Sequence, residues 1–174
     1  QATSNNNSDE QGDAVERIVV TSDFSQRSPD NLATSVTVLG ERSLSLRQAE
    51  QLEDIIGVVP NLNFSSGASR GKFIQIRGIG ERSLFAEPIN ASVALVVDEI
   101  NFSGLGGLGA LFDVQQVEVL SGPQSTGFGA TGLAGIIKIV SNVATDSPAG
   151  YIQGSYAQYN TQRFSAAYSD QIAE

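Results

Sequence analysis

Cysteine and histidine are both absent from this chain of 174 residues. Their absence excludes a Ser-His-Asp triad, a Cys-His pair and any zinc site built from thiolates or imidazoles within these residues. It also excludes a disulfide framework, although a lack of cysteine does not by itself assign a redox compartment. We therefore expect a protein that is not an enzyme and that carries no catalytic residues, no metal and no cofactor.

Positive charge is also scarce. The chain has 10 Lys and Arg against 19 Asp and Glu, which gives a formal net charge of −9. Nucleic acids reward clustered Lys and Arg, and anionic membrane surfaces attract basic segments. Neither is expected as a partner of this chain.

Long hydrophobic runs are missing as well. The longest, Val93–Val97, has the length of a strand, whereas a membrane-spanning helix needs about 18 or more apolar residues. The length suffices for one domain with a core, or for one domain and an appendage. The first residues, Gln1-Ala2-Thr3, resemble the start of an exported protein after cleavage of its signal.

The N-terminal region divides into a tether and a short β-type segment. Residues 1–15 are polar, small and acidic, and are expected to be disordered because they offer little apolar area to bury. Residues 17–21 form an isolated β-branched run. Such a run suits pairing with the sheet edge of another chain, and an edge strand of the domain itself is an equal alternative.

The central region is expected to be an α+β domain. Residues 35–39 alternate as a strand does, and residues 45–56 are predicted to form a helix that Ser45 and Gln48 cap and that Gly57 and Pro60 end. Further strands are predicted at 72–77, 92–97, 114–120 and 133–140. The loops between them, 65–71, 78–91 and 99–112, exceed what a compact hairpin needs, and long loops of this kind usually carry function.

The most unusual stretch is Gly122–Gly135, which holds five glycines and a proline between two apolar strands. It contains Gly127-x-Gly-x-x-Gly132, and Gly104–Gly109 repeats this dinucleotide-binding spacing. That motif must open a helix, whereas strand patterns follow both copies. The P-loop spacing of Gly122–Gly127 fails because Phe128 stands at the lysine position. A nucleotide-dependent enzyme is therefore the weaker alternative.

Two charged features admit functional interpretations that we consider weaker than structural ones. Asp98-Glu99 is a carboxylate pair after a strand, which could bind Mg²⁺ or act as acid and base. Adjacent strand residues point to opposite faces, so an acidic turn is favoured. Arg70, Lys72 and Arg82 could serve an anionic ligand, but solvated loop charges explain them better.

The last residues differ in kind from the rest. Residues 150–159 and 163–168 are rich in Tyr, Ser, Ala and Gly, and flank the polar turn 160–162. This composition is typical of transmembrane β-barrel strands, with a small soluble hairpin as the alternative. Two strands cannot close a barrel, so the chain is expected to stop just after a larger element begins.

The order of motifs resembles the plug domain of TonB-dependent outer-membrane receptors over residues 16–145. Its parts are Glu16–Ser22, similar to a TonB box; Leu52–Ile56 with Val59–Leu62; Ile76-Arg77-Gly78; Val96–Glu99; Val117–Ser125; and Phe128-Gly129 with Gly135–Val140. Four positions depart from the pattern of the family. Ser121 stands in place of arginine, Glu99 and Asn61 in place of glycine, and Lys138 in place of asparagine.

The resemblance implies a small mixed-sheet plug with short helices and long loops at 30–145. It follows a tether at 1–15 and a TonB box at 16–22, and precedes the first antiparallel strands of a truncated transmembrane barrel at 149–174. The barrel of this class has about 22 strands. The implied function is import of a scarce small molecule across the outer membrane. The plug would gate the barrel, and TonB in the periplasm would remodel the plug by pairing with the N-terminal box. A soluble periplasmic ligand-binding or adhesion domain is the alternative.

The resemblance also implies roles for individual residues. TonB would contact Glu16, Arg17, Ile18, Val19, Val20, Thr21 and Ser22. Loops facing the ligand would include Ser69, Arg70, Lys72, Glu81, Arg82, Phe102 and Leu105. Arg77 and Glu118 would lock the plug to its barrel, and with Ser121 in place of arginine this lock would be reduced or rearranged. Gly122, Pro123, Gly129 and Gly135 would form a structural turn. The identity of the substrate is not readable from these residues.

Overall fold

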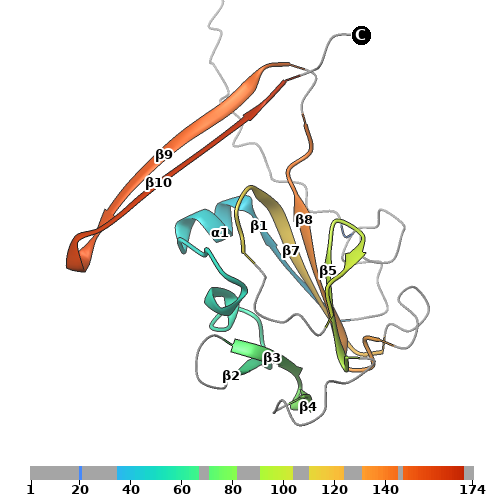
Figure 1. Ribbon diagram of the computed structural model, residues 1–174. Coiled ribbons are helices and arrows are strands. Elements are labelled where there is room, and N and C mark those ends of the chain that lie inside the picture. Colours follow the sequence, from blue (N-terminus) through green and yellow to red (C-terminus); the bar gives the residue numbers. More distant parts are fainter. Residues whose placement is uncertain are drawn as a thin grey trace, which may run out of the picture.

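The structure is a computed structural model, and it describes Val20 and residues 35–66, 71–81, 91–103, 110–123, 131–144 and 147–170. Its largest element is a mixed sheet with the strand order β1-β7-β8-β5-β6 (Figure 1). The strands are β1 (Ser35–Gly40), β7 (Val114–Ser121), β8 (Gly135–Ser141), β5 (Val93–Val97) and β6 (Ile100–Asn101). β5 and β8 are parallel, and the other neighbours are antiparallel. The predicted strands at 35–39, 92–97, 114–120 and 133–140 are thus confirmed within a few residues.

Within the described part of the domain, a second sheet and two short helices accompany the main sheet. The sheet consists of β2 (Leu62–Ser66), β3 (Gly71–Ile76) and β4 (Ile79–Gly80) in chain order. Of these, only β3 was predicted, as 72–77. The helices are α1 (Glu41–Leu46) and the 3-10 helix η2 (Leu52–Ile55). The domain is therefore a small mixed-sheet α+β fold, as expected.

The single helix predicted for 45–56 is wrong. The chain leaves the helical conformation at Gln48, whose φ is 51°, and Gln51 then forms a β-bridge with Ala110. A capping box between Gln51 and Asp54 starts η2, in place of the predicted cap at Ser45. Leu46, which the helical pattern placed on the apolar face, is 79% exposed. Pairing with a residue distant in the sequence has overridden the local helical periodicity.

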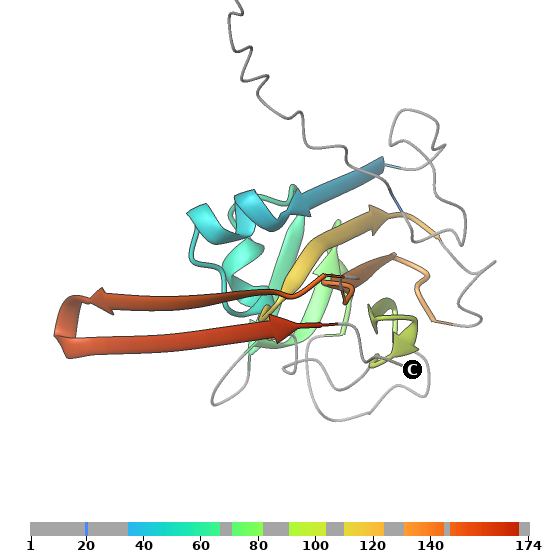
Figure 2. The ribbon, with the colours of Figure 1, turned by 90° about the horizontal axis from the view of Figure 1, so that it is seen from above.

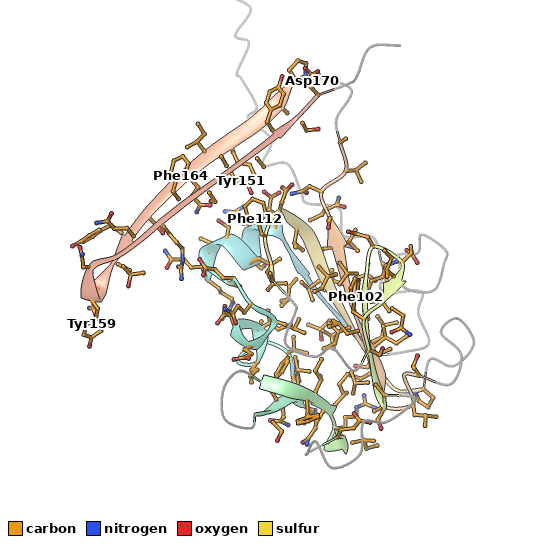
Figure 3. The ribbon with its side chains drawn as sticks, in the orientation of Figure 1. Phe102, Phe112, Tyr151, Tyr159, Phe164 and Asp170 are labelled. Carbon is orange, nitrogen blue, oxygen red and sulfur yellow. The ribbon has the colours of Figure 1, made fainter. Side chains whose placement is uncertain are left out.

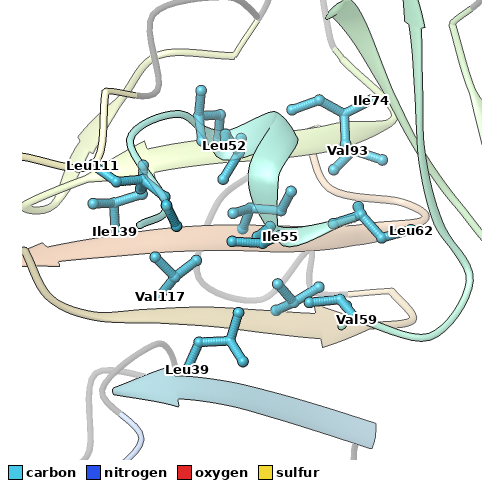
Figure 4. Close-up of a cluster of buried hydrophobic side chains, with 14 of the residues drawn as sticks. Leu39, Leu52, Ile55, Val59, Leu62, Ile74, Val93, Leu111, Val117 and Ile139 are labelled. Carbon is cyan, nitrogen blue, oxygen red and sulfur yellow. The ribbon is translucent and has the colours of Figure 1, made fainter. Parts of the chain in front are cut away.

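The main hydrophobic core lies between the five-stranded sheet and the elements η2, β2 and β3 (Figure 4). Alternate residues of the sheet strands point into it, among them Val117, Ile139 and Val93, because side chains on a strand alternate between faces. Ile55 of η2 is fully buried against them. This packing fixes the two sheets relative to each other.

The chain ends in a hairpin of β9 (Ala149–Ala157) and β10 (Thr161–Ser169), with the short turn η4 (Gln158–Asn160) at its tip. It extends away from the domain on the side of α1, higher than α1 in Figure 1 and beside it in Figure 2. The two predicted strands at 150–159 and 163–168 are confirmed within two residues, but the turn between them lies at 158–160 and not at the predicted 160–162. Among the described residues, no helix is both long and apolar enough to cross a membrane.

Candidate functional site

The strand directions give the five-stranded sheet two distinct ends. At one, β5 and β8 finish and the chain leaves for β9; we call this the exit end, and it contains Asp98, Asp113 and Ser141. At the other, β5 and β8 begin and β7 finishes; we call this the glycine end, and it contains Gly122 and Gly135. In Figure 1 the exit end is uppermost, beneath the hairpin.

The glycine end is held by backbone hydrogen bonds that join three chain segments. Gly122 N–H donates to the Ala134 carbonyl at 2.9 Å, and Ala134 N–H donates to the Ser92 carbonyl at 2.8 Å. Gly135 has a φ of 155°, and a Cβ there would lie 2.3 Å from the Leu120 carbonyl oxygen. Only glycine permits this approach of β8 to β7. Gly129 of the predicted turn lies outside the described residues, and Pro123 is exposed.

The same geometry bears on the dinucleotide motif. Gly132, its last glycine, has a φ of 81° and is followed within three residues by β8. No helix begins there, so no helix N-terminus is available to bind a phosphate at this position. The first copy, Gly104–Gly109, lies outside the described residues, and Ala110 after it pairs with Gln51.

Of the residues predicted to face a ligand, Ser69, Arg70, Arg82 and Leu105 lie outside the described part of the chain. The other three are Lys72, Glu81 and Phe102. Lys72 belongs to strand β3. Glu81 Oε1 accepts hydrogen bonds from both the amide and the hydroxyl of Ser92, each at 2.8 Å. Phe102 packs against the main core (Figure 3). The ligand-facing role of these residues stays a prediction.

These two hydrogen bonds hold Glu81, which follows β4, beside Ser92, which directly precedes β5. Glu81 is fixed further because its carbonyl accepts a hydrogen bond from the Gln75 side chain at 3.1 Å. Sequence reasoning singled out Glu81 but missed Ser92. A serine directly before a buried strand has no feature in the sequence that marks it as a partner for a distant carboxylate.

Arg77 of the predicted lock occupies the two-residue turn between β3 and β4. Arg77 and Gly78 both have positive φ values, 54° and 78°, which is the pattern of a type I′ hairpin turn. The Arg77 side chain is exposed, and its backbone N–H donates to the Asn61 carbonyl at 2.9 Å. A non-glycine residue in this conformation stores backbone strain. Its role in a lock stays a prediction.

We expect Arg77→Asn to stabilise the chain against urea by about 0.5–1 kcal/mol, because asparagine tolerates the left-handed conformation that strains arginine. Urea unfolding followed by circular dichroism measures this change. Arg47→Asn is the matched control, since Arg47 is also exposed but has an ordinary φ of −92°. Equal shifts in both variants would show that strain at residue 77 is not the cause.

A row of polar residues crosses the face of the five-stranded sheet that lies away from the main core. Glu118 of β7 stands opposite Lys138 of β8, and both are almost completely buried, at 0% and 2% exposure. Gln116 donates to Glu118 at 2.6 Å. The Lys138 ammonium donates to Glu99 Oε1 at 2.5 Å and forms an ion pair with it. Glu118, predicted for the lock, therefore lies inside the sheet, among polar partners of the same domain.

Glu99 and Lys138 are two of the positions at which the sequence departs from the family pattern. They lie 39 residues apart in the chain, and the structure brings them together as one ion pair. Glu99 has a φ of 69°, a conformation that suits the glycine expected there. The two departures therefore meet in one contact.

The turn Asp98-Glu99 closes the hairpin between β5 and β6, which confirms the interpretation as an acidic turn. The Asp98 carboxylate accepts hydrogen bonds from the Ser141 amide at 2.8 Å and the Ser141 hydroxyl at 2.6 Å. These bonds tie the turn to the last residue of β8. No group of three or more acidic residues that could hold a metal ion occurs in the part of the chain that the structure describes.

Val20 is the one residue of the TonB-box-like segment 16–22 that the structure describes. It takes part in a β-bridge and is fully buried. Glu16, Arg17, Ile18, Val19, Thr21 and Ser22 lie outside the described residues. The roles of the segment as a TonB box or as an edge strand of the domain both stay predictions.

The hairpin has two chemically different faces. Ile152, Tyr156, Phe164 and Tyr168 share one face, and each is between 73% and 76% exposed. Gln153, Ser155, Arg163 and Ser165 lie on the other and line a cavity of about 480 Å³ between the hairpin and the domain. Figure 3 shows Tyr151 and Phe112 on opposite sides of this gap. Across it, the Arg163 guanidinium forms an ion pair with the Glu50 carboxylate.

Comparisons with known proteins agree with this geometry. The family described as TonB-dependent Receptor Plug Domain matches residues 28–136. The pesticin receptor of Yersinia pestis is 33% identical over 154 residues, which is 88% of this chain and 22% of the receptor. The pesticin receptor of Yersinia enterocolitica is 34% identical over 146 residues, or 83% of this chain and 21% of that protein.

Two solved structures extend the comparison. The ferric yersiniabactin uptake receptor FyuA from Yersinia pestis superposes with a TM-score of 0.66 at 32% identity, over 79% of this chain and 22% of that one. The ferripyoverdine receptor of the outer membrane of Pseudomonas aeruginosa gives a TM-score of 0.71 over 86% of this chain and 19% of that one. At 16% identity this second likeness concerns the fold alone. The chain spans about a fifth of the length of these relatives.

Proposed function

Because the chain belongs to the family of TonB-dependent receptor plug domains, we propose that it is the gating part of an outer-membrane importer for a ferric siderophore. The observation that carries this proposal is its 32% identity to a ferric yersiniabactin uptake receptor, over 79% of the chain. The matched relatives are receptors, and this favours an importer over a soluble periplasmic binding or adhesion domain and over an enzyme.

The hairpin supports the proposal as the start of a barrel wall. β9 and β10 have nine residues each, and a tilted transmembrane strand needs about 9–11. The apolar face places Tyr156 and Tyr168 near opposite ends of the hairpin, with Ile152 and Phe164 between them. This is the arrangement of aromatic girdles around an apolar band. The polar face turns toward the domain, as the lumen face of a plugged barrel would.

In the proposed mechanism, substrate binds outside the plug, and TonB engages residues 16–22 from the periplasm. Val20 is fully buried, so pairing with TonB requires this residue to leave its bridge. The partner then adds the segment to its own sheet through backbone hydrogen bonds. Pulling on the segment would remodel the plug and open a path through the barrel.

Growth of a Gram-negative host under iron limitation tests the proposed function. The intact receptor containing this chain is expressed in a host that lacks its own ferric-siderophore receptors. Growth on at least one ferric siderophore is expected when TonB is functional, and none when TonB is deleted. Failure of a broad siderophore panel, with the receptor present in the outer membrane, would contradict the proposal.

We expect Val19→Pro to abolish binding between the chain and the C-terminal domain of TonB, because proline removes a backbone donor that β-pairing requires. Isothermal titration with the purified domain measures the binding. Val19→Ala should bind nearly as well as the native chain, since the backbone supplies most of the affinity. Ala14→Pro, outside the segment, should bind normally. Unchanged binding by Val19→Pro would exclude β-augmentation at this segment.

A further inference from the structure

We infer that Glu50 and Arg163 form an anchor pair that fastens the plug to the second strand of the barrel wall. The inference rests on the proposed function, because it treats the hairpin as part of that wall. The anchor pair carries its negative charge on the plug and its positive charge on the wall. This polarity is opposite to the lock of plug arginines against barrel carboxylates that the resemblance implies.

Glu50 is held in a fixed position on the plug. Its backbone N–H donates to Asp54 Oδ2 at 2.9 Å, and its carbonyl accepts a hydrogen bond from Leu111 N–H at 2.8 Å. The next residue, Gln51, is in the bridge to Ala110. The carboxylate of Glu50 thus projects from backbone that is tied on both sides, which lowers the entropy lost when it pairs with a partner.

Arg163 reaches Glu50 because of its place in the hairpin. It stands opposite Ser155, on the polar face that lines the cavity. Its neighbours in sequence, Gln162 and Phe164, are on the outer face. An arginine on the outer face of a barrel strand would be exposed to lipid at high cost, whereas on the inner face its charge meets Glu50.

The predicted lock residues do not serve this contact. Arg77 lies in the turn before β4, and Figure 1 shows β4 at the opposite end of the molecule from β9 and β10. Ser121 has no charge, and Glu118 is buried within the sheet. The Glu50 and Arg163 side chains keep 41% and 48% exposure, so both can be exchanged without disturbing the core.

Charge exchange in the intact receptor tests the anchor pair. The variants are Glu50→Arg, Arg163→Glu and the double exchange, with Glu41→Arg as the matched control. Glu41 lines the same cavity and undergoes the same change of charge, but it makes no ion pair among the described residues. The readout is passive entry of a large antibiotic through the outer membrane, together with TonB-dependent growth on the ferric siderophore.

Each single reversal is expected to raise antibiotic entry on the order of fivefold. A factor of this size corresponds to the weaker interaction energies found between contacting residues. The double exchange should return entry to the native level, and Glu41→Arg should stay there throughout. Reversals that match Glu41→Arg, or a double exchange that fails to restore the barrier, would overturn the anchor pair. If a receptor with a single reversal does not reach the membrane, Glu50→Gln and Arg163→Gln replace it and should each raise antibiotic entry by a smaller factor. Antibiotic entry at the native level in both of these variants would also overturn the anchor pair.

The outcome is separable from that of the proposed function. If the native receptor supports no TonB-dependent growth while the exchange cycle behaves as expected, the importer proposal fails and the anchor pair stands. If growth is TonB-dependent but none of the charge variants changes antibiotic entry, only the anchor pair fails.

Discussion

Replacement of Gly135 with alanine is expected to lower the free energy of unfolding of the chain by at least about 3 kcal/mol. Two causes act together. The φ of 155° strains any residue with a side chain, and the added Cβ would lie 2.3 Å from the Leu120 carbonyl oxygen and 2.8 Å from Ile76 Cδ1. Because this oxygen belongs to the backbone of β7, which lies between β1 and β8 in the sheet, the clash can be relieved only by moving β8 away from it. Urea unfolding of the full chain, followed by circular dichroism, measures the loss.

Two further glycines separate the causes. A Cβ on Gly57 would meet nothing within 4 Å, and that residue has no unusual φ, so Gly57→Ala should change stability by less than about 0.5 kcal/mol. Gly122 also has open space, but its φ is 120°, so Gly122→Ala should show the strain alone, about 1–2 kcal/mol. Equal losses in Gly135→Ala and Gly122→Ala would mean that β8 yields to the new methyl group at no cost.

The strands of the main sheet were predictable because their cause is local. Runs such as Val93–Val97 and Ile136–Val140 are rich in β-branched residues and, apart from Lys138, apolar, and most of their residues are buried. β2 was missed because its sequence, Leu-Asn-Phe-Ser-Ser, lacks β-branched residues. It forms a strand because it pairs with β3.

The helix at 45–56 fails for the opposite reason. Its apolar spacing fits a helix, but Gln51 is captured by Ala110, some sixty residues further along the chain. No local pattern reports such a bridge. The same limit applies to the site. The unusual residues Glu99 and Lys138 were identified one by one from the resemblance, yet their contact depends on the parallel register of β5 and β8.

A second large loss of stability is expected on substitution of Lys138, which the register of the sheet places among buried residues. We expect Lys138→Met to lower the free energy of unfolding by about 3 kcal/mol or more, as leaving a buried charge without a neighbour of opposite sign does. Lys138 is 2% exposed, and it stands directly opposite Glu118, which is fully buried. The methionine fills a similar volume, so the loss would come from leaving Glu118 without its cationic neighbour across the strands rather than from a cavity.

Two companion variants decide whether that buried neighbour is the cause. The double variant Glu118→Leu, Lys138→Met should regain stability to within about 1 kcal/mol of the native chain, because apolar side chains can replace two facing buried charges with little net loss. Glu99→Gly should change stability by less than about 1 kcal/mol. It removes an ion pair whose carboxylate is 57% exposed, but it also relieves the positive φ of 69°. If Glu99→Gly instead lowers the free energy of unfolding as much as Lys138→Met, then Lys138 stabilises the fold through the turn at the exit end and not through the buried carboxylate of Glu118.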